Sequence, residues 1–82
     1  MQETARSPTQ LGHIIKQRRK ALKLTQNALA IKVGTRQTTV SLIEKGEPGT
    51  HVKTIFDTLI ALELEVVIRP REKNTVSFED IF

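Results

Sequence analysis

The chain has 82 residues and a mass of 9.3 kDa, which is enough for one small domain and leaves no room for a second hydrophobic core. It contains no cysteine, so disulfides and thiolate metal sites are excluded and a reducing compartment is expected. The formal net charge of +4 is unevenly spread, because no acidic residue occurs between Thr4 and Ile43, where eight basic residues lie. This half of the sequence is suited to contact with a polyanion.

The first predicted element is a helix over residues 8–22. Ser7 is expected to cap it, Pro8 suits its first position, and Gln10 is expected to close a capping box with Ser7. Leucine and isoleucine residues then recur at helical spacing, which leaves most of the basic side chains on the outer face.

Two short helices are predicted next, over residues 26–33 and 36–44. Thr25 is expected to cap the first of them, and Gly34 to end it in a left-handed conformation. Only two residues separate the helices, which predicts a tight turn. Three apolar side chains are expected to form the small core between them: Leu29, Val40 and Ile43.

A fourth helix is predicted after a turn at residues 45–49, with Thr50 as its cap. Its apolar side chains are spread over a broad face, and they are Val52, Ile55, Phe56, Leu59, Ile60 and Leu62. Residues 64–70 are rich in β-branched side chains and end at a proline, which is typical of a strand. A lone strand needs a partner, so we expect pairing across a homodimer through Val66, Val67 and Ile68.

These elements divide the chain into an N-terminal arm (1–7), a helical domain (8–63), a dimerisation strand (64–70) and a C-terminal tail (71–82). The tail is acidic, and it carries the apolar side chains Phe78, Ile81 and Phe82. These side chains either fold back on their own domain or dock on a partner protein, and the composition does not separate the two possibilities.

Residues 24–46 carry a specific pattern: Leu24-Thr25-Gln26-x-x-Leu29-Ala30-x-x-Val33-Gly34-Thr35-x-Gln37-x-Thr39-Val40-Ser41-x-Ile43-Glu44-x-Gly46. The pattern resembles the signature of the Xre/Cro–cI repressor family. The resemblance implies a mainly α, four- to five-helix lambda-repressor-like DNA-binding domain, with one C-terminal strand that pairs across a homodimer. In such a domain the second helix of a helix-turn-helix enters the major groove of DNA.

The same resemblance implies three sets of functional residues. Base contacts are expected from Arg36, Gln37, Thr38 and Ser41. Gln37 is the best candidate for direct readout, because a carboxamide pairs bidentately with adenine N6 and N7. Contacts with the DNA backbone are expected from Thr25, Gln26, Lys45 and Arg6. The family also implies a structural pair between the basic helix and the recognition helix, formed by Arg19 and Glu44.

A strand after the fourth helix and a tail with apolar side chains together resemble the HipB antitoxins, which partner a kinase-fold toxin, HipA. The predicted function is therefore a DNA-binding antitoxin that represses its own operon, binds a pseudo-palindromic operator as a dimer and neutralises a HipA-like kinase toxin. A stand-alone Xre-type repressor without a toxin, and an adaptor that uses the fold without DNA, are the alternatives.

Enzymatic and metal-dependent functions are not expected. His13 and His51 are the only histidines, and neither has the spacing of a metal ligand pair. The sequence holds no nucleophile elbow and no phosphate-binding glycine loop, so no catalytic residue, metal or cofactor is predicted. The N-terminus lacks a signal-peptide core, and no apolar run approaches the ~20 residues of a membrane span, which favours a cytoplasmic, nucleoid-associated protein.

Overall fold

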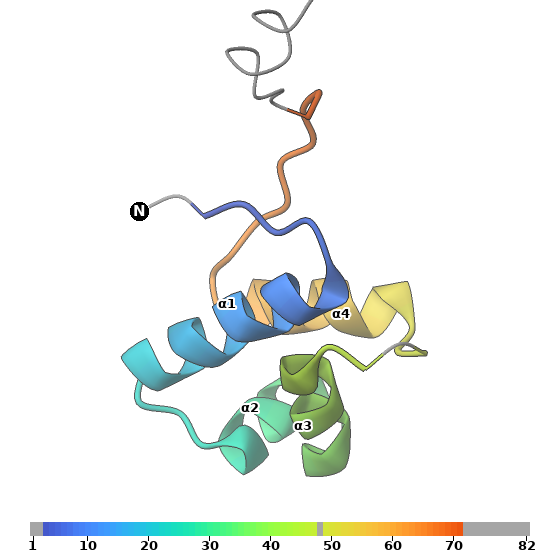
Figure 1. The fold of residues 1–82 in the computed structure, drawn as a ribbon. Coiled ribbons are helices and arrows are strands. Elements are labelled where there is room, and N and C mark those ends of the chain that lie inside the picture. The colour runs from blue at the N-terminus through green and yellow to red at the C-terminus, as the bar shows by residue number, and fades with distance from the viewer. Residues whose placement is uncertain (1–2, 48, 72–82) are drawn as a thin grey trace, which may run out of the picture.

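The computed structural model describes residues 3–47 and 49–71, and this part of the chain contains four helices (Figure 1). The helices are α1 (Pro8–Ala21), α2 (Gln26–Val33), α3 (Gln37–Lys45) and α4 (Val52–Ala61). α1 and α4 form one layer, and α2 and α3 lie beneath them. The expected mainly α, lambda-repressor-like architecture is confirmed. None of the described helices is long and apolar enough to cross a membrane.

The start of α1 ties the N-terminal arm to the helix. As predicted, Ser7 caps the helix, with its Oγ accepting the N–H of Gln10 at 3.1 Å, which satisfies one of the unpaired amides of the first turn. The reciprocal half of the capping box is not formed. The Gln10 side-chain oxygen instead accepts the main-chain N–H of Arg6, so the arm is held one residue further from the helix than a capping box would hold it.

The turn between α2 and α3 follows the sequence prediction closely. Thr25 Oγ1 accepts the N–H of Ala28 at 3.0 Å, and Gly34 ends α2 with φ of 82°, a conformation that costs glycine little. The N–H of Thr35 then bonds the carbonyl of Ala30 at 2.9 Å, which completes a Schellman-type ending. α3 begins one residue later than expected, because Arg36 is its extended N-cap residue, and it ends one residue later, at Lys45 before the left-handed Gly46.

The core lies where α1 and α4 meet the α2–α3 pair. α3 packs against both α1 and α2, and α4 packs against α2. The three apolar residues predicted to lie between α2 and α3 are all buried. Within residues 3–47 and 49–71, the buried apolar residues are Ile15, Leu29, Ala30, Val40, Ile43, Leu59 and Leu62. This small set holds α3 at one edge of the molecule.

α4 differs from its prediction in two respects. Its N-cap residue is His51 rather than Thr50, and no side chain caps it. Three of the side chains assigned to its apolar face are exposed, at 71% for Val52, 47% for Phe56 and 69% for Ile60. α4 packs on one side only, so a broad apolar face is half covered. We call these three residues, which recur every four positions, the α4 stripe.

Residues 64–71 leave α4 and run beside the N-terminal arm (Figure 1), where Arg69 Nη2 donates to Thr4 Oγ1 at 3.2 Å. Residues 64–71 have neither helix nor strand in this single chain. The expected strand pairs only between two chains, so it stays a prediction. Its three apolar residues are exposed, Ile68 most of all at 92%. The tail residues Phe78, Ile81 and Phe82 lie outside the described residues.

Candidate nucleic-acid interface

The first turn of α3 presents polar side chains to solvent. Arg36, Gln37 and Thr38 are exposed, and Ser41, one turn later, is half-buried. The opposite face of α3 carries the buried residues Val40 and Ile43. Ser41 is four residues from Gln37 and three from Thr38, so these three share one face of α3. Arg36 is the exposed N-cap residue just before that face.

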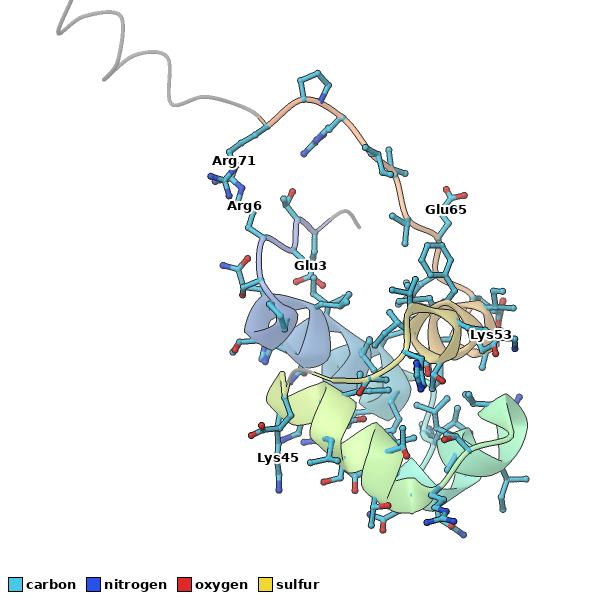
Figure 2. All side chains as sticks on the ribbon, turned by 90° about the vertical axis from the view of Figure 1, so that its right-hand side faces the viewer. Glu3, Arg6, Lys45, Lys53, Glu65 and Arg71 are labelled. Carbon is cyan, nitrogen blue, oxygen red and sulfur yellow. The ribbon has the colours of Figure 1, made fainter. Side chains whose placement is uncertain are left out.

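The predicted DNA-backbone residues occupy three places. Thr25 and Gln26 form the start of α2, and the first main-chain amides of a helix have no partner within it, which suits such a helix end to binding phosphate. Lys45 ends α3 and extends away from the other helices (Figure 2). An added Cβ at Gly46 would meet the main chain of Thr9, so this end of α3 lies at the start of α1. Arg6 lies in the N-terminal arm beside Arg71, away from Lys45 (Figure 2), so the structure of the free protein does not bring the two together.

Arg19 and Glu44 form a bidentate, nearly buried ion pair. Arg19 Nε donates to Glu44 Oε2 at 2.6 Å and Arg19 Nη2 to Oε1 at 3.1 Å, while Nη1 donates to the carbonyl of Leu24 at 2.8 Å. The side chains are only 9% and 3% exposed. One guanidinium, carried by α1, thus bonds both the loop that precedes α2 and the carboxylate on α3 through charge-assisted hydrogen bonds.

The surroundings of Glu44 favour its ionised form. Burial alone raises its pKa, but hydrogen bonds from Arg19 and Gln26 and the positive charges of Arg19 and Lys16 outweigh burial, so that the net pKa lies below its ordinary value. The carboxylate is therefore charged at neutral pH, and it accepts hydrogen bonds without donating any.

A helix-turn-helix family model matches residues 15–65 of the chain, a stretch that contains α2, the turn and α3. The chain belongs to the helix-turn-helix family. Antitoxin HipB from Escherichia coli K12 is 39% identical to this helix-turn-helix protein over 62 residues, covering 76% of this chain and 70% of the relative. HipB from E. coli O6:H1 strain CFT073 shows the same identity, and the matched part spans 66% of its length.

The chain is also similar to solved structures of HipB. The structure of a HipA–HipB–O2–O3 complex contains a chain that is 34% identical, with a TM-score of 0.79, covering 87% of this chain and all of that one. The predicted resemblance to the Xre-type family and to HipB is confirmed.

Three contacts of this protein were missed by sequence reasoning. Gln26 donates from Nε2 to Glu44 Oε1 at 3.0 Å, and Gln37 Nε2 donates to Gln26 Oε1 at 2.7 Å, so two glutamines predicted to contact DNA separately also contact each other. The available signal was their shared position, since each is the first residue of its helix. Arg18 Nε donates to the carbonyl of Leu62 at 3.0 Å, at the end of α4, a contact with no such signal.

Proposed function

We propose that this protein is a DNA-binding antitoxin that represses its own operon. The observation that carries the proposal is the exposed start of α3, where the N-cap residue Arg36 and the first helical residues Gln37 and Thr38 are in solvent while the other face of the helix is buried. Arginine and glutamine are the side chains that pair bidentately with guanine and adenine in the major groove. The relatives support the proposal, because they are named HipB antitoxins.

We propose a division of roles across the interface. Gln37 pairs with a base, Arg36 with guanine or a phosphate, and Thr38 and Ser41 contact neighbouring base edges. The start of α2, with Thr25 and Gln26, meets one phosphate, and Lys45 meets the backbone from the other end of α3. Arg6 reaches the backbone separately, from the N-terminal arm.

The proposed DNA-binding form is a homodimer. Two surfaces support a second copy as the occupant: the α4 stripe and the segment Val66–Ile68, both of which are apolar and exposed. A domain with so small a core usually needs a further source of stability, and the chain has no cysteine. Two-fold related copies would present two α3 helices to half-sites about one helical turn, or a multiple, apart.

The proposed protein partner is a HipA-like toxin kinase. HipA accompanies HipB in a structural relative, and we interpret the O2 and O3 of that complex as operator sites. We expect the tail to contribute to toxin capture, and we do not expect this chain to carry catalytic groups of its own. An operator-bound regulator acts at the chromosome, so the proposal places the protein in the cytoplasm with the nucleoid.

Operator binding and toxin capture are tested separately. A shift assay on the DNA upstream of the protein's own gene should show saturable binding that unrelated DNA does not displace. Co-expression with a kinase-like neighbouring gene product should yield a complex, and deletion of residues 76–82 should weaken that complex while leaving operator binding unchanged. Operator binding without any toxin complex would favour the stand-alone repressor, and a complex without operator binding would favour the adaptor.

A further inference from the structure

A continuous chain of hydrogen bonds joins the buried ion pair to the exposed glutamine of α3. It passes from the Arg19 guanidinium to the Glu44 carboxylate, from there to the Gln26 carboxamide, and ends at Gln37. The last two contacts are 3.0 and 2.7 Å long. These hydrogen bonds lead from an ion pair whose side chains are 9% and 3% exposed to a side chain in solvent.

Each member of this chain restricts the orientation of the next. A carboxylate only accepts hydrogen bonds, so the group that Gln26 turns toward Glu44 has to be its NH2. The carbonyl of Gln26 then faces Gln37. Since a carbonyl only accepts, Gln37 has to offer its own NH2 to Gln26. A solitary glutamine can flip its amide at little cost, but here the flip of Gln37 would place two carbonyl oxygens against each other.

We propose that Glu44 is a positioning residue that sets the orientation of the Gln37 amide, and with it the choice of adenine at one position of each operator half-site. This inference depends on the proposed function, in which Gln37 faces a base. In the fixed orientation, one Nε2 hydrogen is used by Gln26, which leaves the second hydrogen and the Oε1 acceptor for DNA.

The remaining donor and acceptor match the major-groove edge of adenine. Adenine presents an acceptor at N7 and a donor at N6, so Gln37 Nε2 donates to N7 while Oε1 accepts from N6. A flipped amide would reverse this order and set Nε2 against the N6 donor. Guanine offers acceptors at both N7 and O6 and leaves Oε1 without a donor. The ion pair therefore acts on base selectivity through Gln26 and touches no base itself.

The informative measurement is a ratio of affinities. Competition assays compare the natural operator with operators in which the contacted pair is changed to each of the other three. Gln37→Ala tests the proposed function itself, and the preference should fall about tenfold or more. If this variant keeps the preference, Gln37 does not choose the base, and the base-contact role given to Gln37 in the proposed function is wrong.

Gln26→Ala tests the inference while leaving the Arg19–Glu44 pair in place. A lost phosphate contact would weaken all four operators alike and cancel in the ratio. Free reorientation of Gln37 would instead lower the preference for adenine several-fold. In a Gln37→Ala background, the same Gln26→Ala change should leave the ratio as it is. A wild-type ratio in Gln26→Ala, beside a lost ratio in Gln37→Ala, would overturn the inference.

A matched pair of substitutions at Glu44 separates amide orientation from loss of stability. Glu44→Gln is nearly isosteric, but it can turn an NH2 toward Gln26 and reverse the chain, whereas Glu44→Asp keeps an acceptor-only group. Assayed at a temperature where both variants are folded, Glu44→Gln should lose the adenine preference about tenfold and Glu44→Asp should retain most of it. Equal losses in the two variants, or a wild-type ratio in Glu44→Gln, would overturn the positioning role.

Discussion

Gly12 of α1 lies directly against the main chain of Glu44 in α3. A Cβ added to Gly12 would come within 2.7 Å of the Glu44 carbonyl oxygen, and it would also clash with the carbonyl of Ile43. The two helices therefore touch through their backbones at this point. Arg19 lies seven residues further along α1, on the same face of the helix. The close approach at Gly12 accordingly brings Arg19 within reach of the Glu44 side chain.

Gly12→Ala should destabilise the protein, although alanine is the better helix former by about 0.5–1 kcal/mol. The added methyl meets main-chain atoms that cannot move aside, and overpacking of this kind costs about 1–3 kcal/mol. Urea unfolding measures the change in free energy, with Gln17→Ala on the exposed face of α1 as the control. A Gly12→Ala variant as stable as the wild type would show that α1 and α3 separate without cost.

Arg19→Ala should lower the stability by about 3–5 kcal/mol, because it leaves the buried Glu44 carboxylate without its counter-charge. DNA affinity should fall as well, since the pair joins α1 to α3. The matched control is Lys53→Ala, which removes an exposed pair with Asp57 and should cost no more than about 0.5 kcal/mol. Thermal melting of the two variants distinguishes these outcomes. Similar melting temperatures would mean that the Arg19 pair contributes no more than a surface pair.

Glu44 should also make stability depend on pH. Its pKa in the folded protein lies below the ordinary value of 4.5, so the unfolded chain binds a proton more readily than the folded one. The stabilisation is therefore complete above pH 4.5 and is lost as the pH falls through the lower folded pKa. Unfolding free energies measured between neutral and acidic pH should decline in the wild type and decline less in Glu44→Gln. Parallel declines would assign the acid sensitivity to other carboxyl groups.

Lys45→Ala should weaken binding to every operator sequence by a similar factor, in contrast to Gln37→Ala. Lys45 extends from the end of α3 (Figure 2), where we propose that it meets a phosphate, and phosphate contacts carry no sequence information directly. Affinities for the natural operator and for single-base variants provide the comparison. A selective loss on one base pair would instead place Lys45 among the residues that choose the sequence.

The dimer prediction is tested on both apolar surfaces. Phe56→Asp places a charge in the α4 stripe, and Val67→Pro removes a main-chain donor from the proposed strand. Each change should shift the protein toward the monomer in sedimentation experiments, whereas Val67→Thr, which keeps the donor, should remain dimeric. A wild-type protein that sediments as a monomer at micromolar concentration would contradict the prediction.

Local signals in the sequence were sufficient to predict the helix-turn-helix itself. The caps at Ser7 and Thr25 and the left-handed Gly34 act within a few residues, and the matching residues form the expected turns. The exposed α4 stripe was missed, because hydrophobicity shows which residues are apolar but not whether a neighbouring element covers them. The contact between Gln26 and Glu44 joins residues 18 positions apart. Such a contact depends on how α2 and α3 cross, and no short motif records that crossing.

The internal contacts of Arg18 and Arg19 affect how strongly DNA binding depends on salt. Eight basic residues in an acid-free stretch imply a large release of condensed counterions when the protein meets DNA, with log K falling by about 0.9 for each phosphate neutralised per unit of log salt. Arg19 is already neutralised by Glu44. Arg18 keeps its charge, but its Nε is held by the carbonyl at the end of α4. Fewer cations than the composition provides are therefore available to replace counterions. Operator binding should accordingly be less sensitive to ionic strength than the eight basic residues of the acid-free stretch would indicate.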